Sequence, residues 1–185
     1  MPVVLVRTPT YRRPQLLTRA LRCLQSQTHQ DWVCEVRDDC PQGSARAVVE
    51  ALGDRRVHYV QNVPQKFMVK NLDDCYHKDN PFKADHFFML EDDNQVRPEF
   101  MSTGIEICSQ MGVSICQMNQ VVEHNTDVEV PFVGDVGIFD DIFDEKVYTS
   151  GEFRLAMFGA IGISNGAVFW SKSILNEMAV RVPTI

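Results

Sequence analysis

Four short apolar runs, each followed by a turn and by a stretch with helically spaced apolar residues, occupy most of the first 110 residues. The runs cover residues 3–6, 32–36, 57–60 and 86–90. Short runs rich in β-branched and aromatic residues are typical of buried strands, and their alternation with helices predicts a parallel sheet. We therefore expect a doubly wound, Rossmann-like α/β fold whose mostly parallel sheet carries helices on both faces.

The helices between these strands are predicted from their start and stop signals. Pro14 suits the first turn of one helix. Ser44 suits the cap of the next, for which Gly53 is the expected terminator. A third helical segment carries Lys70, and a fourth covers residues 98–110. Because each helix returns the chain to the next parallel strand, the loops after the strands should share one edge of the sheet.

The second half of the chain has a different composition. Residues 121–152 contain nine acids and a single basic residue, Lys146. A long acidic stretch of this kind is typical of a solvated loop, and long loops in compact domains are often lids or binding loops. Residues 160–170 are then expected to form a strand, with Ser171 capping a final helix.

Composition excludes several classes of function. The formal net charge of −7 argues against a surface that binds nucleic acid. The six cysteines form no CxxC pair, which indicates reduced thiols and a reducing compartment. No apolar run approaches the roughly 20 residues that cross a bilayer, and no leader pattern opens the chain. We therefore expect a cytoplasmic protein without a transmembrane segment, at most peripheral to a membrane.

Three of the predicted strand ends carry polar residues. The first strand leads into residues 8–13, the second into Asp38 and Asp39, and the fourth into residues 91–94. Ligands of open α/β sheets bind at the carboxyl ends of strands, so these residues should converge on one crevice.

The fourth strand end, in "FFMLEDDNQVRPEF", places three carboxylates side by side. Adjacent anions need solvent, a metal ion or hydrogen-bonding substrate groups to be tolerated there. Carboxylate oxygens suit a hard divalent cation such as Mg²⁺ or Mn²⁺, with substrate phosphates completing the shell. The cations of Arg12, Arg13 and Lys70 are candidates to meet a diphosphate.

The stretch "VVLVRTPTYRRPQLLTRALRCLQSQTHQDWVCEVRDDCP" resembles the opening of a family 2 glycosyltransferase of GT-A fold. That family has a strand, P-T-Y-N-R-P, an amphipathic helix, a Q-T segment and a strand ending in D-D-G-S. The similarity continues through "VHYVQN" and "KNLDDC", and "FFMLEDDNQVRPEF" resembles the D-x-D segment of the family. It covers about residues 3–101 and implies an enzyme that uses a nucleoside diphosphate sugar and a divalent metal.

The resemblance also implies roles for single residues. In the nucleotide site, Thr8, Pro9 and Tyr11 would line the base pocket, Asp39 would contact the base, and Lys70 would face the donor.

At the D-x-D segment, Asp93 matches the metal-binding carboxylate, and Glu91 or Asp92 matches the acid that faces the ribose. The register is open, because E-D-D matches either Glu91-x-Asp93 or the adjacent pair Asp92 and Asp93.

The chain departs from the family pattern at three places. Arg12 replaces the usual asparagine, and Cys40-Pro41 replaces glycine-serine. The catalytic base of the family follows a segment similar to "SNGAVFWSKSIL", so we expect it beyond Ile185, with residues 1–185 forming one GT-A domain that lacks a C-terminal portion. Five acids of the segment 121–152 are alternative bases that the sequence does not rank: Asp135, Asp140, Asp141, Asp144 and Glu152.

These features predict an inverting, metal-dependent glycosyltransferase. The donor would be a nucleoside diphosphate sugar, with UDP favoured, and the acceptor a saccharide, lipid-linked or other hydroxyl. Two alternatives stay open: a catalytically incomplete nucleotide-sugar-binding module, and a nucleotidyltransferase, although "RTPTYRRP" lacks the glycine-rich phosphate loop that such an enzyme normally has. A homodimer is also compatible with the sequence.

Overall fold

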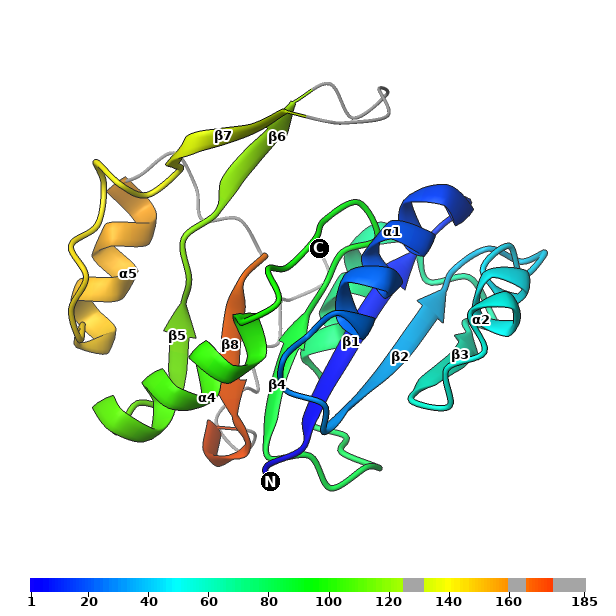
Figure 1. The fold of residues 1–185 in the computed structure, drawn as a ribbon, viewed down its shortest axis with the longest axis horizontal. Coiled ribbons are helices and arrows are strands. Elements are labelled where there is room, and N and C mark those ends of the chain that lie inside the picture. Colours follow the sequence, from blue (N-terminus) through cyan, green and yellow to red (C-terminus); the bar gives the residue numbers. More distant parts are fainter. Residues whose placement is uncertain (125–131, 160–165, 175–185) are drawn as a thin grey trace.

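The computed structural model describes residues 1–124, 132–159 and 166–174, arranged around a central sheet (Figure 1). The sheet has six strands in the order β3-β2-β1-β4-β8-β5. In chain order these strands are β1 (Val4–Thr10), β2 (Trp32–Asp38), β3 (Val57–Gln61), β4 (His86–Met89), β5 (Ile115–Gln117) and β8 (Val168–Ser171). Strands β3, β2, β1 and β4 are parallel, whereas β8 is antiparallel to both β4 and β5.

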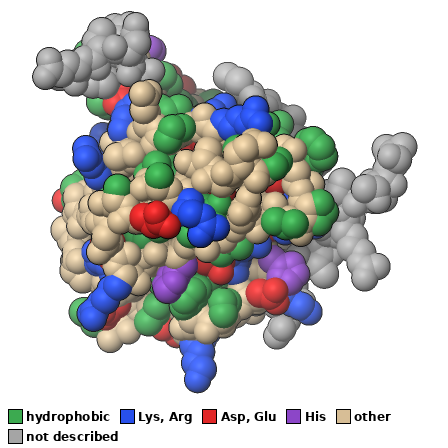
Figure 2. Space-filling model, turned by 90° about the vertical axis from the view of Figure 1, so that its right-hand side faces the viewer, with side chains coloured by type: hydrophobic (Ala, Val, Ile, Leu, Met, Phe, Trp, Pro, Cys, Tyr) green, Lys and Arg blue, Asp and Glu red, His purple; other side chains and the backbone are tan. Residues whose placement is uncertain are grey.

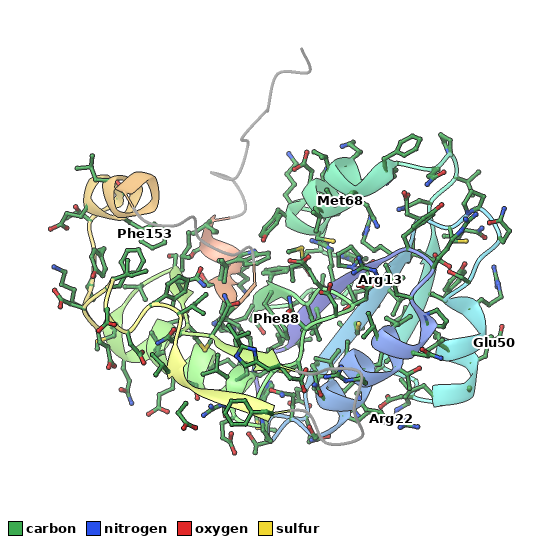
Figure 3. All side chains as sticks on the ribbon, turned by 90° about the horizontal axis from the view of Figure 1, so that it is seen from above. Arg13, Arg22, Glu50, Met68, Phe88 and Phe153 are labelled. Atoms are coloured by element: carbon green, nitrogen blue, oxygen red, sulfur yellow. The ribbon has the colours of Figure 1, made fainter. Side chains whose placement is uncertain are left out.

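Helices cover both faces of this sheet. They are α1 (Pro14–Gln25), α2 (Arg46–Leu52), α3 (Phe67–Asp73), α4 (Phe100–Met111) and α5 (Ser150–Gly159), with short 3₁₀ turns at Asp74–Tyr76 and Lys172–Ile174. Seen from above, α3 with Met68 lies on one side of the sheet and α1 with Arg22 on the other (Figure 3). The expectation of a doubly wound, mostly parallel α/β fold is therefore confirmed.

The order of the strands creates a switch point between β1 and β4. From β1 the chain builds outward through β2 to β3, and it then returns to place β4 on the other side of β1. The next strand after β1 is therefore added on one side of it and β4 on the other, and ligands of folds of this type bind at the carboxyl ends of the strands at such a switch point.

The core explains why the first strand lies in the middle of the sheet. Val4, Leu5 and Val6 are completely buried because helices pack on both faces of β1. A second layer is aromatic: Phe88 of β4 and Phe169 of β8 contact Phe100 at the start of α4, with ring centroids 4.8 Å and 6.1 Å from that of Phe100. The aromatic contacts fix α4 over β4 and β8.

A buried arginine ties the opposite face of the sheet to the segment after α3. Arg7 donates from Nε to Glu35 on β2 at 2.9 Å. Its Nη1 donates to the carbonyl oxygens of Cys75 and His77 at 3.2 Å and 2.7 Å, and its Nη2 donates to the carbonyl oxygen of Asp79. Because a charge in the interior must be paired and hydrogen-bonded, this network locks Arg7 in place.

Two predicted helix starts are wrong. The fourth helix begins at Phe100 and not at Pro98. Helix α2 begins after Ala45, with no side-chain cap from Ser44. The buried Asp38 carboxylate, at the end of β2, accepts the N–H of Ala45 at 2.8 Å instead, so it satisfies a backbone donor at the start of the helix.

The acidic segment 121–152 is not the continuous loop that its composition predicts. It contains β6 (Val121–His124) and β7 (Phe132–Gly137), an antiparallel ribbon outside the main sheet, and the start of α5. The ribbon rises beyond the carboxyl edge of the sheet (Figure 1). Apolar and acidic residues do not alternate in either strand, so no period-two pattern predicted them. Helix α5 starts with a capping box between Thr149 and Glu152.

The remaining predictions have mixed outcomes. Strand β5 was not predicted, because three residues give too short a pattern. Of the strand predicted at residues 160–170, residues 160–165 lie outside the described part of the chain, and the observed strand β8 ends at Ser171. Ser171 is followed by a 3₁₀ turn, and the helix expected after it lies outside the described residues beyond Ile174.

All six cysteines are free thiols, as expected. Among residues 1–124, 132–159 and 166–174, none of the helices combines the length and the apolar composition needed to cross a bilayer. Figure 2 shows the side of the molecule that carries α2 and the β3 edge, where basic and acidic side chains are interspersed. This side of the molecule therefore offers no single-sign patch for nucleic acid.

We predict that Gly104→Ala destabilises the fold. A methyl group at Gly104 of α4 would lie 2.7 Å from ring atoms of Phe169, whose side chain is fully buried. Overpacking of this kind costs about 1–3 kcal/mol, against which a better helix former returns about 0.5–1 kcal/mol. Urea unfolding should show a net loss of about 1–2 kcal/mol.

Gly151→Ala in α5 is the matched control, because nothing lies within 4 Å of the added methyl group. Its stability should be unchanged or slightly higher. Equal losses in the two variants would contradict the packing of α4 against β8.

Candidate functional site

The ends of three strands meet at Thr10, the last residue of β1. The backbone N–H of Asp39, after β2, donates to the carbonyl oxygen of Thr10 at 3.0 Å. The Thr10 hydroxyl donates to Asp92 Oδ2, after β4, at 2.6 Å. The expected convergence of these strand ends is confirmed. Thr10 lies in the predicted loop range 8–13 but was not singled out, because the first strand was predicted to end at residue 6, whereas β1 continues to Thr10.

A tight reversal after β1 brings Arg13 over the acids that follow β4. Arg12 has φ 56°, in the left-handed region that asparagine tolerates better than arginine. The family pattern has an asparagine at this position, so the replacement retains the turn at some conformational cost. Arg12 is held by a hydrogen bond from Nη2 to Gln42 at 2.8 Å.

Arg13 then points to the carboxyl edge of the sheet (Figure 3). Its Nη1 atom lies 3.3 Å from Asp92 Oδ1 and 2.8 Å from Asp93 Oδ2. A single guanidinium nitrogen thus joins the two acids that follow β4.

The three acids of this segment have different surroundings. Asp92 is buried, and burial raises the pKa of its carboxyl group, while the hydrogen bond from Thr10 and the charge of Arg13 act in the opposite direction. Glu91 is half-buried, and its carboxylate has no hydrogen-bond or ion-pair partner among the residues that the structure describes, although its backbone carbonyl accepts the Asn94 N–H at 3.1 Å. Burial raises the pKa of Glu91, and the negative charges of Asp93 and Asp92 add to this effect. Asp93 is the most exposed of the three.

The Asp39 carboxylate is fully engaged within the chain. Its Oδ1 atom accepts from the Asn62 side chain at 3.0 Å and from the Lys66 N–H at 2.7 Å. Its Oδ2 atom accepts from the N–H of Phe67, a residue with φ 63°. Left-handed backbone at a bulky residue persists only when its surroundings impose it, so Asp39 anchors the start of α3. Its contact with a nucleotide base stays a prediction.

The other residues predicted for the nucleotide site are less closely grouped. Thr8 and Pro9 are buried in β1, and the Thr8 hydroxyl lies 3.6 Å from Cys34 Sγ. The exposed ring of Tyr11 lies under the Arg12 guanidinium, 5.0 Å from its centroid. Lys70 on α3 pairs with Asp74 at 2.8 Å, and in the described part of the chain it has no ion pair with the acids after β4.

Two of the five alternative bases have structural roles. Asp140 Oδ2 accepts the Gly137 N–H at 2.7 Å, which closes a turn. Glu152 completes the capping box of α5, a T-x-x-E signal that the sequence already contained. The other three are exposed, and the structure favours none of them: Asp135, Asp141 and Asp144.

We predict that Glu91→Gln stabilises the protein at neutral pH, because it removes a desolvated charge beside two like charges. The gain should be about 0.5 kcal/mol, since partial exposure screens the repulsion. The control is Glu50→Gln on α2, an exposed position away from these acids (Figure 3). Chemical unfolding of both variants provides the measurement.

The gain should also depend on pH. A raised folded-state pKa means that the folded protein keeps the Glu91 proton to a higher pH than the unfolded chain does. The contribution of Glu91 to stability therefore falls as pH rises through the folded-state pKa, and the advantage of Glu91→Gln should disappear below about pH 4. An advantage that persists in acid would contradict this account.

Comparison with known proteins gives structural matches only. No protein-family model and no curated protein sequence matches the chain. The crystal structure of S. aureus TarS 1-349 in complex with UDP-GlcNAc matches at a TM-score of 0.64 and 13% identity, over 99% of this chain and 49% of that chain. The chain thus spans about half the length of TarS 1-349.

Two further matches are weaker. Mannosyltransferase PcManGT from Pyrobaculum calidifontis in complex with GDP-Man and Mn²⁺ has a TM-score of 0.53 and 15% identity, over 64% of this chain and 36% of that chain. CMP:2-keto-3-deoxy-manno-octonic acid synthetase complexed with CTP has a TM-score of 0.52 and 10% identity, over 98% and 79%. The matches confirm that the chain has the GT-A fold expected from its sequence.

Proposed function

We propose that this chain is the donor-binding part of an inverting glycosyltransferase that takes a sugar from a nucleoside diphosphate, with UDP favoured, and passes it to an acceptor hydroxyl. The observation that carries the proposal is the junction at Thr10. There the ends of β1, β2 and β4 bring Arg13 and the acids after β4 together at the switch point of a GT-A fold. Two proteins with this fold have structures with sugar nucleotides bound: TarS 1-349 with UDP-GlcNAc, and mannosyltransferase PcManGT with GDP-Man and Mn²⁺.

The hydrogen bonds favour one of the two registers of E-D-D. Both oxygens of Asp92 are engaged, one with Thr10 and one with Arg13. The Glu91 carboxylate, by contrast, has no partner within the described residues, and the Asp93 carboxylate is bound by Arg13 through Oδ2 alone. We therefore assign Glu91 to a ribose hydroxyl and Asp93 to the metal, with Asp92 as the buried residue that positions them.

The donor atoms present fit a hard divalent cation. Within the described residues no group of three or more acidic, histidine or cysteine side chains converges on a metal site. Mg²⁺ and Mn²⁺, however, are commonly held by one or two carboxylates together with substrate phosphates, and Asp93 offers a partly exposed carboxylate. When bound, the metal would offset the charge of the departing diphosphate.

The remaining roles follow from exposure. The exposed Tyr11 ring offers a flat surface for a base beside the junction, and Asp39 shapes the neighbouring loop by holding α3. Inversion also requires a group that takes the proton of the attacking hydroxyl. The position of this base beyond Ile185 stays a prediction.

A second candidate is nucleotidyl transfer, favoured by the match to the CMP:2-keto-3-deoxy-manno-octonic acid synthetase, which extends over 98% of this chain. Such an enzyme releases pyrophosphate from a nucleoside triphosphate, whereas a glycosyltransferase releases a nucleoside diphosphate from the sugar donor. Assays of the two products separate these activities. A binding module would hold the nucleotide and form neither product.

We predict that UDP with Mn²⁺ raises the unfolding temperature and that Asp93→Asn removes the increase. Nucleotide at about 100 times its dissociation constant stabilises the folded state by about 2.7 kcal/mol, which is roughly 5–10 °C for a chain of this size. GDP, dTDP and CDP, each with and without Mn²⁺, identify the preferred base.

Asp31→Asn is the matched control, because its side chain is 44% exposed, compared with 43% for Asp93, and it precedes β2 at the opposite edge of the sheet. It should keep the full shift. Absence of a shift with every nucleotide would count against the proposal.

A further inference from the structure

Arg13 is placed where a cation neutralises two carboxylates at once. Its Nη1 atom contacts Asp92 at 3.3 Å and Asp93 at 2.8 Å. Asp92 is buried and is fixed on its other oxygen by Thr10, so it cannot turn toward solvent. Asp93 is partly exposed and has one oxygen outside this ion pair. A metal ion bound to Asp93 would therefore share this carboxylate with the guanidinium.

The attachment of Arg13 is weak in comparison with that of Arg7. The Arg13 side chain is 52% exposed, and its hydrogen bonds among the described residues go to these two acids. Arg7 is buried and binds three carbonyl oxygens besides Glu35. The pair with the partly exposed Asp93 contributes about 0–1 kcal/mol, so the Arg13 head group can leave Asp93 at little cost.

We propose that Arg13 is an internal counter-cation that holds the acids after β4 in place before the donor binds, and that it changes partner from Asp93 to the donor diphosphate when a divalent cation binds. The inference rests on the proposed function, because it requires a diphosphate in this crevice. Arg13 is a positioning residue in the first state and a phosphate ligand in the second.

Electrostatics gives the reason for the exchange. A divalent cation at Asp93 and a guanidinium on the same carboxylate repel each other, so each weakens the binding of the other. A diphosphate brings new negative charge, and arginine pairs with phosphate oxygens through parallel hydrogen bonds. Metal and donor together therefore release Arg13 from Asp93 and offer it a better partner nearby.

This exchange predicts effects of opposite sign for one substitution. Arg13→Gln removes the competing cation, so the affinity for Mn²⁺ alone should increase, on the order of tenfold. The same variant lacks the phosphate ligand, so its affinity for UDP at saturating Mn²⁺ should fall about tenfold. A purely structural role for Arg13 would weaken both affinities.

Two titrations of the whole chain test the exchange. In the first, Mn²⁺ is added alone and electron paramagnetic resonance measures the concentration of the free ion. In the second, UDP is added at saturating Mn²⁺ and calorimetry measures its affinity. Arg22→Gln is the matched control, because it removes an exposed arginine from α1 without touching the acids (Figure 3). It should leave both affinities near those of the unchanged protein. The double variant Arg13→Gln with Asp93→Asn should lose the gain in Mn²⁺ affinity.

Tighter Mn²⁺ binding combined with weaker UDP binding supports the exchange. Unchanged or weaker Mn²⁺ binding by Arg13→Gln overturns it, provided that circular dichroism shows the variant folded. If that variant is unfolded, Arg13→Lys replaces it, because lysine keeps the charge without the planar fork. Arg13→Lys should leave the affinity for Mn²⁺ near that of the unchanged protein and should lower the affinity for UDP. An affinity for UDP equal to that of the unchanged protein overturns the exchange. Failure of the unchanged protein to bind UDP contradicts the proposed function. This result can be distinguished from failure of the exchange, because the Mn²⁺ titration contains no nucleotide.

Discussion

Two buried aspartates at the end of β2 hold together the edge of the sheet on which the proposed site depends. Asp38 accepts hydrogen bonds from the backbone of Cys40 and Ala45 and so shapes the loop that leads to α2. Asp39 accepts the backbone N–H groups of Lys66 and Phe67 and so fixes the start of α3. Charged acceptors that take several N–H donors are strong partners. Adjacent carboxylates are tolerated here because each has its own set of donors.

The acids after β4 are satisfied less completely, and that difference points to function. Asp92 is buried and bonded to Thr10, whereas the Glu91 carboxylate has no partner within the described residues and Asp93 shares a half-exposed arginine with Asp92. Incomplete satisfaction of buried or partly buried polar groups is typical of sites that await a ligand. A structural acidic turn would show the pattern of Asp38 and Asp39 instead. The contrast between the two strand ends therefore supports a donor site after β4 on a rigid base after β2.

The fold was predictable from sequence because four strand and helix units repeat with clear periods, and parallel strands place their ends on one edge. Strand β8 was expected near its observed position, but its antiparallel insertion between β4 and β5 depends on tertiary packing of Phe169 that no local pattern shows. The ribbon of β6 and β7 was missed because its residues do not alternate between apolar and polar, and because an acidic composition is typical of a loop. At the site, the acids were predictable as residue types, but only the structure distinguishes the engaged Asp92 from the available Glu91, and only the structure identifies Thr10 as the junction.

Hydrogen–deuterium exchange of the whole chain, with and without UDP and Mn²⁺, tests the location of the site most directly. If the donor binds at the junction of β1, β2 and β4, backbone amides in residues 8–13 and 90–94 should exchange more slowly in the complex. Residues 28–31, at the opposite edge of the sheet, should be unaffected. Protection confined to the surface groove between α1 and α2, which Thr18, Arg22, Val48 and Leu52 line, or to the amino ends of the strands, would contradict a donor site after β4.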